Sequence, residues 1–128
     1  MMEQVNFNPS GSALSVNIRY DSNHGGNLFA TYTYTLWESQ SGTIADKSSG
    51  NNFNSQDDNY WLPTPAAKND GRVIDVLSIL KNADNKELTA RVEIEICQAG
   101  STLETVTAAE TLPGHSTVIN QIFIRLLA

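Results

Sequence analysis

The chain has 128 residues, of which 40% are hydrophobic and 17% are charged, with a formal net charge of −6. This length is typical of one domain and lets a chain bury roughly two-thirds of its unfolded surface. We therefore expect residues 1–128 to form a single domain. The eight basic residues are scattered, whereas a nucleic-acid-binding surface needs clustered Lys and Arg. No nucleic-acid partner is predicted.

Asn, Ser and Thr replace the missing charges, with 13, 12 and 11 copies respectively. Thr favours pleated, half-buried surfaces, while Asn and Ser favour turns because their short side chains bond the local backbone. The composition therefore indicates a β protein with many loops.

Compartment signals are few. Cys97 is the only cysteine, which excludes an intramolecular disulfide and suits a reducing compartment. The first residues have neither the basic nor the apolar region of a signal peptide. The longest nearly apolar stretch, Ile122–Ala128, is far shorter than the ~20 residues of a spanning helix. We expect a soluble protein without a membrane span, with the cytoplasm slightly favoured.

The first half of the chain predicts three strands, at Val5–Phe7, Ala13–Tyr20 and Leu28–Trp37. The third alternates strictly, which is the pattern of a strand with two different faces. Trp37 lies on the face that carries threonines. It is either a surface aromatic residue or a plug inside the fold.

The stretch from Ser39 to Asp70 is polar and rich in Ser, Asn, Asp and Gly. A structureless loop of this length is uncommon inside a compact domain. We therefore expect short strands at Gly42–Asp46 and Tyr60–Leu62, linked by ordered loops.

The second half predicts a four-stranded antiparallel run, with strands at Val73–Leu80, Leu88–Ile96, Thr102–Ala109 and Thr117–Leu127. The second of these has one apolar and one polar face, so one side meets the core and the other meets water. The last is apolar on both faces, which favours a central strand.

Two turns follow from local chemistry. Pro113 and Gly114 suit the central positions of a type II turn. A three-residue loop at Ala99–Ser101 would place Ile94 opposite Val106 but Ile96 opposite Glu104, so either a bulge intervenes or the register differs.

Together these features predict an all-β fold, an antiparallel two-sheet β-sandwich of about seven to nine strands, of the immunoglobulin-like, C2-like or jelly-roll-like kind. The strands and polar loops broadly resemble immunoglobulin-like, C2-like and lectin-like sandwiches. The Cys, Trp, Cys spacing of an antibody domain is absent. The resemblance therefore implies a fold and no site residues.

The most suggestive cluster for function lies in the loops around residues 51–62. Aromatic rings stack on the apolar face of a sugar, while carboxylate and amide groups bond its hydroxyls. Tyr60 and Trp61 point to opposite faces of a strand, so only one of them can meet a ligand. The candidate ligand-binding residues are Asn54, Asp57, Asp58, Asn59, Tyr60 and Trp61. We predict a non-enzymatic binding module for carbohydrate or protein, although core packing is the first interpretation of each tryptophan.

Calcium is a candidate ligand at Asp57 and Asp58, because carboxylate and amide oxygens are the ligands it takes. The residue order of an EF-hand loop is missing. No other cofactor is predicted.

Two alternative functions remain open. A glycosidase-like hydrolase would use paired carboxylates, either Glu93 with Glu95 or Asp57 with Asp58, and would need a cleft over them. A structural subunit would form a homo-oligomer, for example a homodimer, through apolar residues that its own loops leave uncovered. The candidates for such a contact are Ile119, Phe123 and Leu127, or Ile74 and Leu80. No catalytic residue is assigned, and binding is favoured over catalysis.

Overall fold

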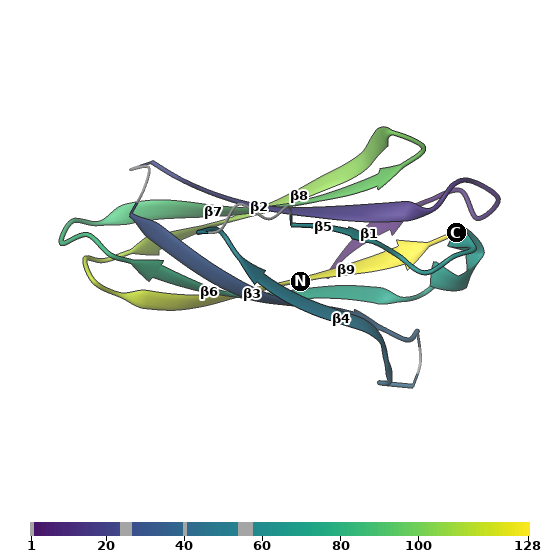
Figure 1. The fold of residues 1–128 in the computed structure, drawn as a ribbon, viewed down its shortest axis with the longest axis horizontal. Coiled ribbons are helices and arrows are strands. Elements are labelled where there is room, and N and C mark those ends of the chain that lie inside the picture. The colour runs from purple at the N-terminus through teal and green to yellow at the C-terminus, as the bar shows by residue number, and fades with distance from the viewer. Residues whose placement is uncertain (1, 24–26, 40, 54–57) are drawn as a thin grey trace.

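The computed structural model describes residues 2–23, 27–39, 41–53 and 58–128. It is an all-β sandwich of two layers, as the sequence predicts (Figure 1). The strands of the described residues are β1 (Met2–Asn6), β2 (Leu14–Ser22), β3 (Leu28–Trp37), β4 (Ile44–Asn51), β5 (Asn59–Trp61), β6 (Val73–Asn82), β7 (Leu88–Gln98), β8 (Ser101–Leu112) and β9 (Thr117–Leu127). A short 3₁₀ turn, η1 (Ala66–Asn69), precedes β6.

The five-stranded sheet has the order β1-β9-β6-β3-β4, and the four-stranded sheet has the order β5-β2-β7-β8. Every neighbouring pair is antiparallel except β1 and β9, which run parallel. The predicted antiparallel sandwich is confirmed, with one parallel pair among the described strands at this edge. Strands β1 and β9 lie at opposite ends of the sequence, so no hairpin turn fixes their relative direction.

The second half of the chain does not form one continuous sheet. Strands β6 and β9 pair in the five-stranded sheet, while β7 and β8 pair in the four-stranded sheet. The four predicted strands exist, but the connections from β6 to β7 and from β8 to β9 each lead from one sheet to the other. Strand β9 lies between β1 and β6, which confirms its predicted central place.

The hairpin between β7 and β8 is tighter than the predicted three-residue loop. Gln98 pairs with Ser101, so only Ala99 and Gly100 form the turn. Their φ angles are 55° and 76°. Positive φ at both central residues matches the right-handed twist of the flanking strands, which favours this tight connection.

A bulge follows that turn and explains the doubtful register. Leu103 has no partner on β7, and the register shifts beside Ile96. Ile96 therefore pairs with Glu104, and Ile94 pairs with Val106. The extra residue restores the alternation of faces beyond the turn.

The turn between β8 and β9 is displaced by one residue from the prediction. The amide of Ser116 donates to the carbonyl of Pro113 at 3.1 Å, so Pro113 is the first residue of the turn and not a central one. His115 takes the positive φ, at 56°. A side chain on Gly114 would overlap the backbone of Asn85, so glycine serves close approach here.

Strand bounds in the middle of the chain also differ from the prediction. The strand expected at Gly42–Asp46 is β4, which extends to Asn51, and the strand expected at Tyr60–Leu62 is β5, displaced by one residue. Strand β8 extends three residues beyond the predicted end at Ala109.

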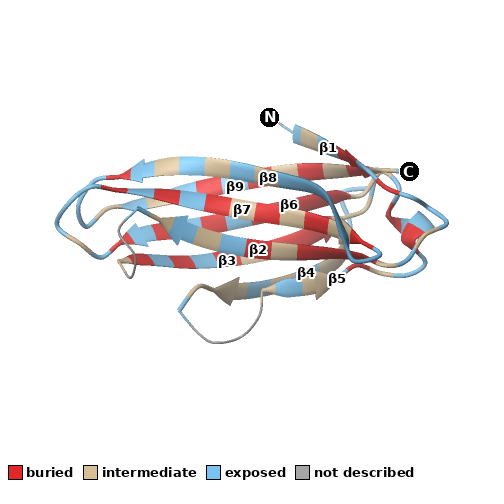
Figure 2. Ribbon diagram, turned by 90° about the horizontal axis from the view of Figure 1, so that it is seen from above, coloured by how far each residue is buried: buried red, intermediate tan, exposed pale blue. Residues whose placement is uncertain are grey.

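The hydrophobic core lies between the sheets (Figure 2). Alternate residues of β3, β6, β7 and β9 face the core and most of them are buried. The residues between them are exposed or half-buried, except Thr35, Val73 and Asp75, which are buried. Two buried amide side chains, Asn82 and Gln98, form hydrogen bonds with the loops at the ends of the sandwich. Asn82 donates to the carbonyls of Lys86 and Leu112 at 2.7 and 3.2 Å, and Gln98 donates to the carbonyl of Ser12 at 2.9 Å. Buried polar groups are tolerated because each finds partners in the loops.

Candidate functional site

The residues predicted to bind a ligand divide between the interior, the surface and the undescribed part of the chain. Asn54 and Asp57 lie outside the described residues. Asp58 directly precedes β5, whose three residues are Asn59, Tyr60 and Trp61. The pairing of β5 with β2 fixes which of these side chains point inward.

Tyr60 points into the sandwich. Its ring stacks on that of Tyr34, with centroids 5.1 Å apart and planes 7° apart. It also meets the ring of Tyr32 edge-on at 6.3 Å, and the two hydroxyls hydrogen-bond to each other. Tyr60 therefore belongs to the inner layer.

Asp58 joins the same interior cluster. The hydroxyl of Tyr32 donates to Oδ1 of Asp58 at 2.6 Å. Tyr20 stacks near Tyr32, with centroids 6.0 Å apart, and its hydroxyl bonds Ser78 Oγ at 2.7 Å. All four tyrosines of the chain thus gather between β2, β3 and β5.

Burial raises the pKa of Tyr20, Tyr32 and Tyr34 above the usual range, because the phenolate would lose its hydration. For Tyr32, the hydrogen bonds to Asp58 and Tyr60 raise the pKa further. These phenols stay protonated, and the hydroxyl of Tyr32 donates to Asp58. The cluster holds β5 against β3 and so fixes the outward side chains of β5.

Trp61 is the exposed member, with 68% of its surface accessible. It lies on the outer face of the four-stranded sheet, directly opposite Ser15 on β2. Two residues along the strands, on the same face, Asn59 lies opposite Asn17. The prediction that Tyr60 and Trp61 face opposite ways is confirmed.

Glu95 on β7 continues this row of polar side chains, because Asn17 pairs with it on the other edge of β2. Its Oε1 accepts from Asn17 Nδ2 at 2.9 Å and from Arg19 at 3.0 Å. Its Oε2 accepts from Thr102 Oγ1 at 2.8 Å. These four side chains are already tied together before any ligand arrives.

The same bonds lower the pKa of Glu95 to about 2, first through Asn17, then Thr102 and Arg19. Hydrogen bonds to a carboxylate favour its charged form. Glu95 is therefore an ionised acceptor at neutral pH. Arg19 also lies 3.7 Å from Glu93, so it bridges the two carboxylates.

The hydrolase alternative needs a carboxylic acid that is protonated at working pH, and such a group has a raised pKa. The pKa of Glu95 is shifted in the opposite direction. Glu93 and Glu95 lie on an outer sheet face, where they share Arg19. Nothing in this arrangement favours glycosidic chemistry, and the pair of Asp57 with Asp58 lies partly outside the described residues.

Two other candidate groups have structural partners. Burial raises the pKa of the Cys97 thiol, which makes it a poor nucleophile. Trp37 lies on the outer face of the five-stranded sheet, and its Nε1 donates to Asp75 at 3.0 Å. It is thus a surface aromatic residue that is tied down, and not a plug inside the core.

Among the described residues, no group of three or more His, Cys, Asp or Glu side chains is placed to hold a metal ion. Asp58 has a tyrosine partner and Asp57 lies outside the described residues, so calcium binding there stays a prediction. No helix within the described ranges is long and apolar enough to cross a membrane.

Sequence reasoning missed Ser15, Asn17 and Arg19 as members of the site. Their alternation with the apolar residues of β2 indicated an outward face. What it could not indicate was that β2 lies between β5 and β7. This order places Asn59 and Glu95 on either side of Asn17, and Trp61 in the next row, opposite Ser15.

No protein-family model, curated protein or solved structure matches the chain.

Proposed function

We propose that this protein is a non-enzymatic module that binds carbohydrate on the outer face of its four-stranded sheet. The supporting observation is the exposed ring of Trp61 beside the hydrogen-bonded side chains of Asn17 and Glu95. An exposed tryptophan on a fixed strand is a stacking platform for the apolar face of a sugar ring. A rigid platform also costs little conformational entropy on binding.

Polar groups for the sugar hydroxyls lie at the correct spacing. Asn59 lies two residues from Trp61 on β5, roughly 7 Å along the strand, and Asn17 lies opposite Asn59 on β2, ~4.8 Å across. A glycan stacked on Trp61 therefore reaches both amides. Glu95, one strand further on, accepts hydrogen bonds from hydroxyls of a second residue of the glycan. The face therefore suits an extended chain of sugars that crosses the strands.

The charge of this face selects the kind of sugar. Glu93 and Glu95 share one basic partner, Arg19, so this part of the face carries an excess of negative charge. Anionic sugars are repelled by such a surface. The proposed ligand is a neutral glycan.

The first test is a printed array of neutral and acidic oligosaccharides, followed by titration of the neutral hits by tryptophan fluorescence. We expect Trp61→Ala to weaken binding at least about tenfold, equivalent to about 1.4 kcal/mol. Phe53→Ala is the matched control, because Phe53 is similarly exposed, at 57%, but packs on Phe29 of the other sheet. The control should bind as the wild type does.

Fluorescence assigns the site to one face, because the two tryptophans lie on different sheets. Trp37→Phe should keep the ligand-induced change in emission, and Trp61→Phe should lose it. An array without neutral hits, or wild-type affinity in Trp61→Ala, would overturn the proposal.

A further inference from the structure

The outer face of the five-stranded sheet carries most of the large apolar side chains that are exposed in the described part of the chain. By register, Met2, Phe29, Ile44, Leu77, Ile79 and Ile119 all point outward from this sheet. Ile119 is 66% exposed and Ile79 is 45% exposed. Exposed apolar residues gathered on one face mark an interaction surface.

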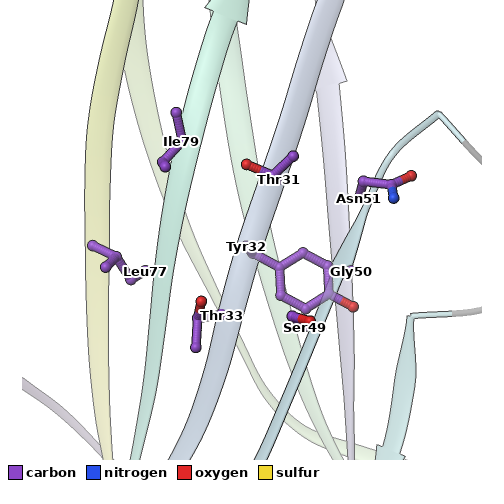
Figure 3. Close-up of a pocket in the computed structure, with 8 residues that line it drawn as sticks. All are labelled: Thr31, Tyr32, Thr33, Ser49, Gly50, Asn51, Leu77 and Ile79. Carbon is purple, nitrogen blue, oxygen red and sulfur yellow. The ribbon is translucent and has the colours of Figure 1, made fainter.

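This face has a ridge and a hollow side by side. The ridge consists of Leu77 and Ile79 on β6 and Ile119 on β9. The hollow, with a volume of about 510 Å³, lies over β3 and β4, and the ridge residues of β6 form its wall (Figure 3). Its small polar side chains are Thr31, Thr33, Ser49 and Asn51.

Cross-strand pairing aligns these features in rows. One row runs Ile119, Ile79, Thr31, Asn51 across β9, β6, β3 and β4. The next row runs Gln121, Leu77, Thr33, Ser49. In both rows the larger side chains lie on β9 and β6 and the smaller ones on β3 and β4.

We propose that this face is the interface of a homodimer, in which the ridge of each copy fills the hollow of the other. A two-fold axis parallel to the strands, between β6 and β3, places β9 over β4 of the second copy and β6 over its β3. Ile119 then meets Asn51, and Ile79 meets Thr31. Such an interface is self-complementary, as two-fold symmetry requires.

The available area matches this occupant. Strand spacing of ~4.8 Å and a rise of ~3.3 Å per residue give the four strands that face the second copy, β9, β6, β3 and β4, roughly 600 Å². Stable interfaces begin at ~1,200 Å² in total, or ~600 Å² on each partner. The ridge and the hollow contain no charged residue, although the chain carries a net charge of −6. A second copy therefore meets no like charge at the centre of the contact.

The residues of this interface differ from those predicted from the sequence. Ile74 and Leu80 are fully buried inside this chain, so they cannot contact a second copy. Ile119 remains, and Leu77 and Ile79 join it. The proposed sugar face lies on the other sheet, so either proposal can fail while the other stands.

The first measurement is the mass of the wild type by sedimentation from about 1 to 100 μM. Interfaces of standard area have dissociation constants from about micromolar to picomolar, so we expect a dimer within this range. A wild type that is monomeric at ~100 μM would overturn the proposal.

Charge substitutions then test the arrangement. Ile119→Lys should weaken the dimer at least tenfold, because dimer formation would bury the charge of the introduced lysine against Asn51 of the second copy. Asn51→Asp should also weaken it, and this variant keeps the oxygen that accepts from the amide of Phe53. Leu103→Lys and Asn59→Asp are the matched controls, because both residues are exposed and belong to the other sheet.

An equimolar mixture of Ile119→Lys with Asn51→Asp is the decisive sample. In the heterodimer one contact pairs the lysine with the aspartate and the other is unchanged, so the dimer should return. The proposed arrangement is wrong if Ile119→Lys dissociates the dimer, Asn51→Asp does not weaken it, and the mixture forms no heterodimer. That result would mean that the ridge of one copy packs on the ridge of the other. A dimer that survives both substitutions lies elsewhere, which also overturns it.

Discussion

The outer faces of the two sheets use the same backbone pattern for opposite chemistry. On the four-stranded sheet, polar and charged side chains bond one another around Glu95, and Trp61 is the exposed aromatic residue beside them. On the five-stranded sheet, the outer face carries exposed apolar residues such as Ile79 and Ile119, and Thr31 lies beside Ile79 on the next strand. The inner faces of both sheets carry the residues of the shared hydrophobic core.

This contrast indicates that the inner faces specify the fold, whereas the outer faces are free to differ in chemistry. A sugar is recognised by oriented hydrogen bonds, so its face needs side chains that are already fixed. A second copy is recognised by shape and apolar area, so the face that binds it needs complementary raised and hollow regions and few charges. The experiments below test whether the two faces are independent on top of one shared interior.

The largest effect is expected at Gly50, which belongs to the shared interior. A Cβ at this position would overlap the hydroxyl of Tyr32 and lie 2.8 Å from Oδ1 of Asp58. Overpacking of a filled interior costs about 1–3 kcal/mol. We expect Gly50→Ala to lower the free energy of unfolding by roughly 3 kcal/mol, measured by urea denaturation, while the exposed neighbour substitution Ser49→Ala has little effect.

The hydroxyl of Tyr32 is the nearest atom in that clash, so Tyr32→Phe should partly relieve it. In a double-mutant cycle, Gly50→Ala with Tyr32→Phe should then be less destabilised than the sum of the two single variants. Additive losses would show that the overlap is absorbed elsewhere.

A smaller effect is expected at Asn82, which joins the two sheets. Its amide, at the end of β6, donates to the carbonyl of Lys86, which lies between β6 and β7, and to the carbonyl of Leu112 at the end of β8. Leaving buried carbonyls unpaired costs about 1–3 kcal/mol. We expect Asn82→Ala to lower the free energy of unfolding by about 2 kcal/mol. Asn85→Ala is the matched control, because Asn85 is exposed.

The same variant tests whether the two sheets unfold together. In the Trp37→Phe and Trp61→Phe backgrounds, the remaining tryptophan reports on one sheet alone. Coincident urea transitions for the two reporters indicate one cooperative unit. Separate transitions would mean that each face depends on its own sheet.

The strands with alternating apolar residues could be predicted from the sequence because one buried face is enough to specify them. Strand β3 begins and ends at Leu28 and Trp37, as predicted, and the apolar residues of β7 are buried as expected. Strand β4 has no such signal, since Lys47, Ser48 and Ser49 follow one another. It forms because β3 offers it backbone partners from Thr31 to Trp37. Tertiary pairing, and not local pattern, decides the bounds of an edge strand.

The candidate site was predictable only in part for a similar reason. Adjacent positions in one strand point to opposite faces, so the separation of Tyr60 from Trp61 follows from geometry alone. The neighbours of Trp61 depend on which strand lies beside β5. Nothing in residues 59–61 specifies β2 as the partner that contributes Asn17. Likewise, the parallel direction of β1 depends on contacts between the two ends of the chain.

The smallest effect is expected from Glu95→Gln, and it should touch only the four-stranded face. The pKa of Glu95 is lowered to about 2 from an ordinary 4.5, so its ionised form stabilises the folded state above pH 4.5. That contribution is lost as the pH falls from 4.5 toward 2. We expect Glu95→Gln to cost about 1 kcal/mol at pH 7, since Arg19 is half exposed and water screens part of the interaction. The difference from the wild type should vanish near pH 2, in urea denaturation at pH 7, 4.5 and 2.

Glu93→Gln is the control on the same face, because Glu93 has one distant contact, 3.7 Å from Arg19. It should change stability less at pH 7. A Glu95→Gln deficit that is equal at all three pH values would mean that the lost interactions do not depend on charge. If the faces are independent, Glu95→Gln should leave the dissociation constant of the dimer unchanged while it weakens neutral glycans. A shift in both would show that the two outer faces communicate through the interior they share.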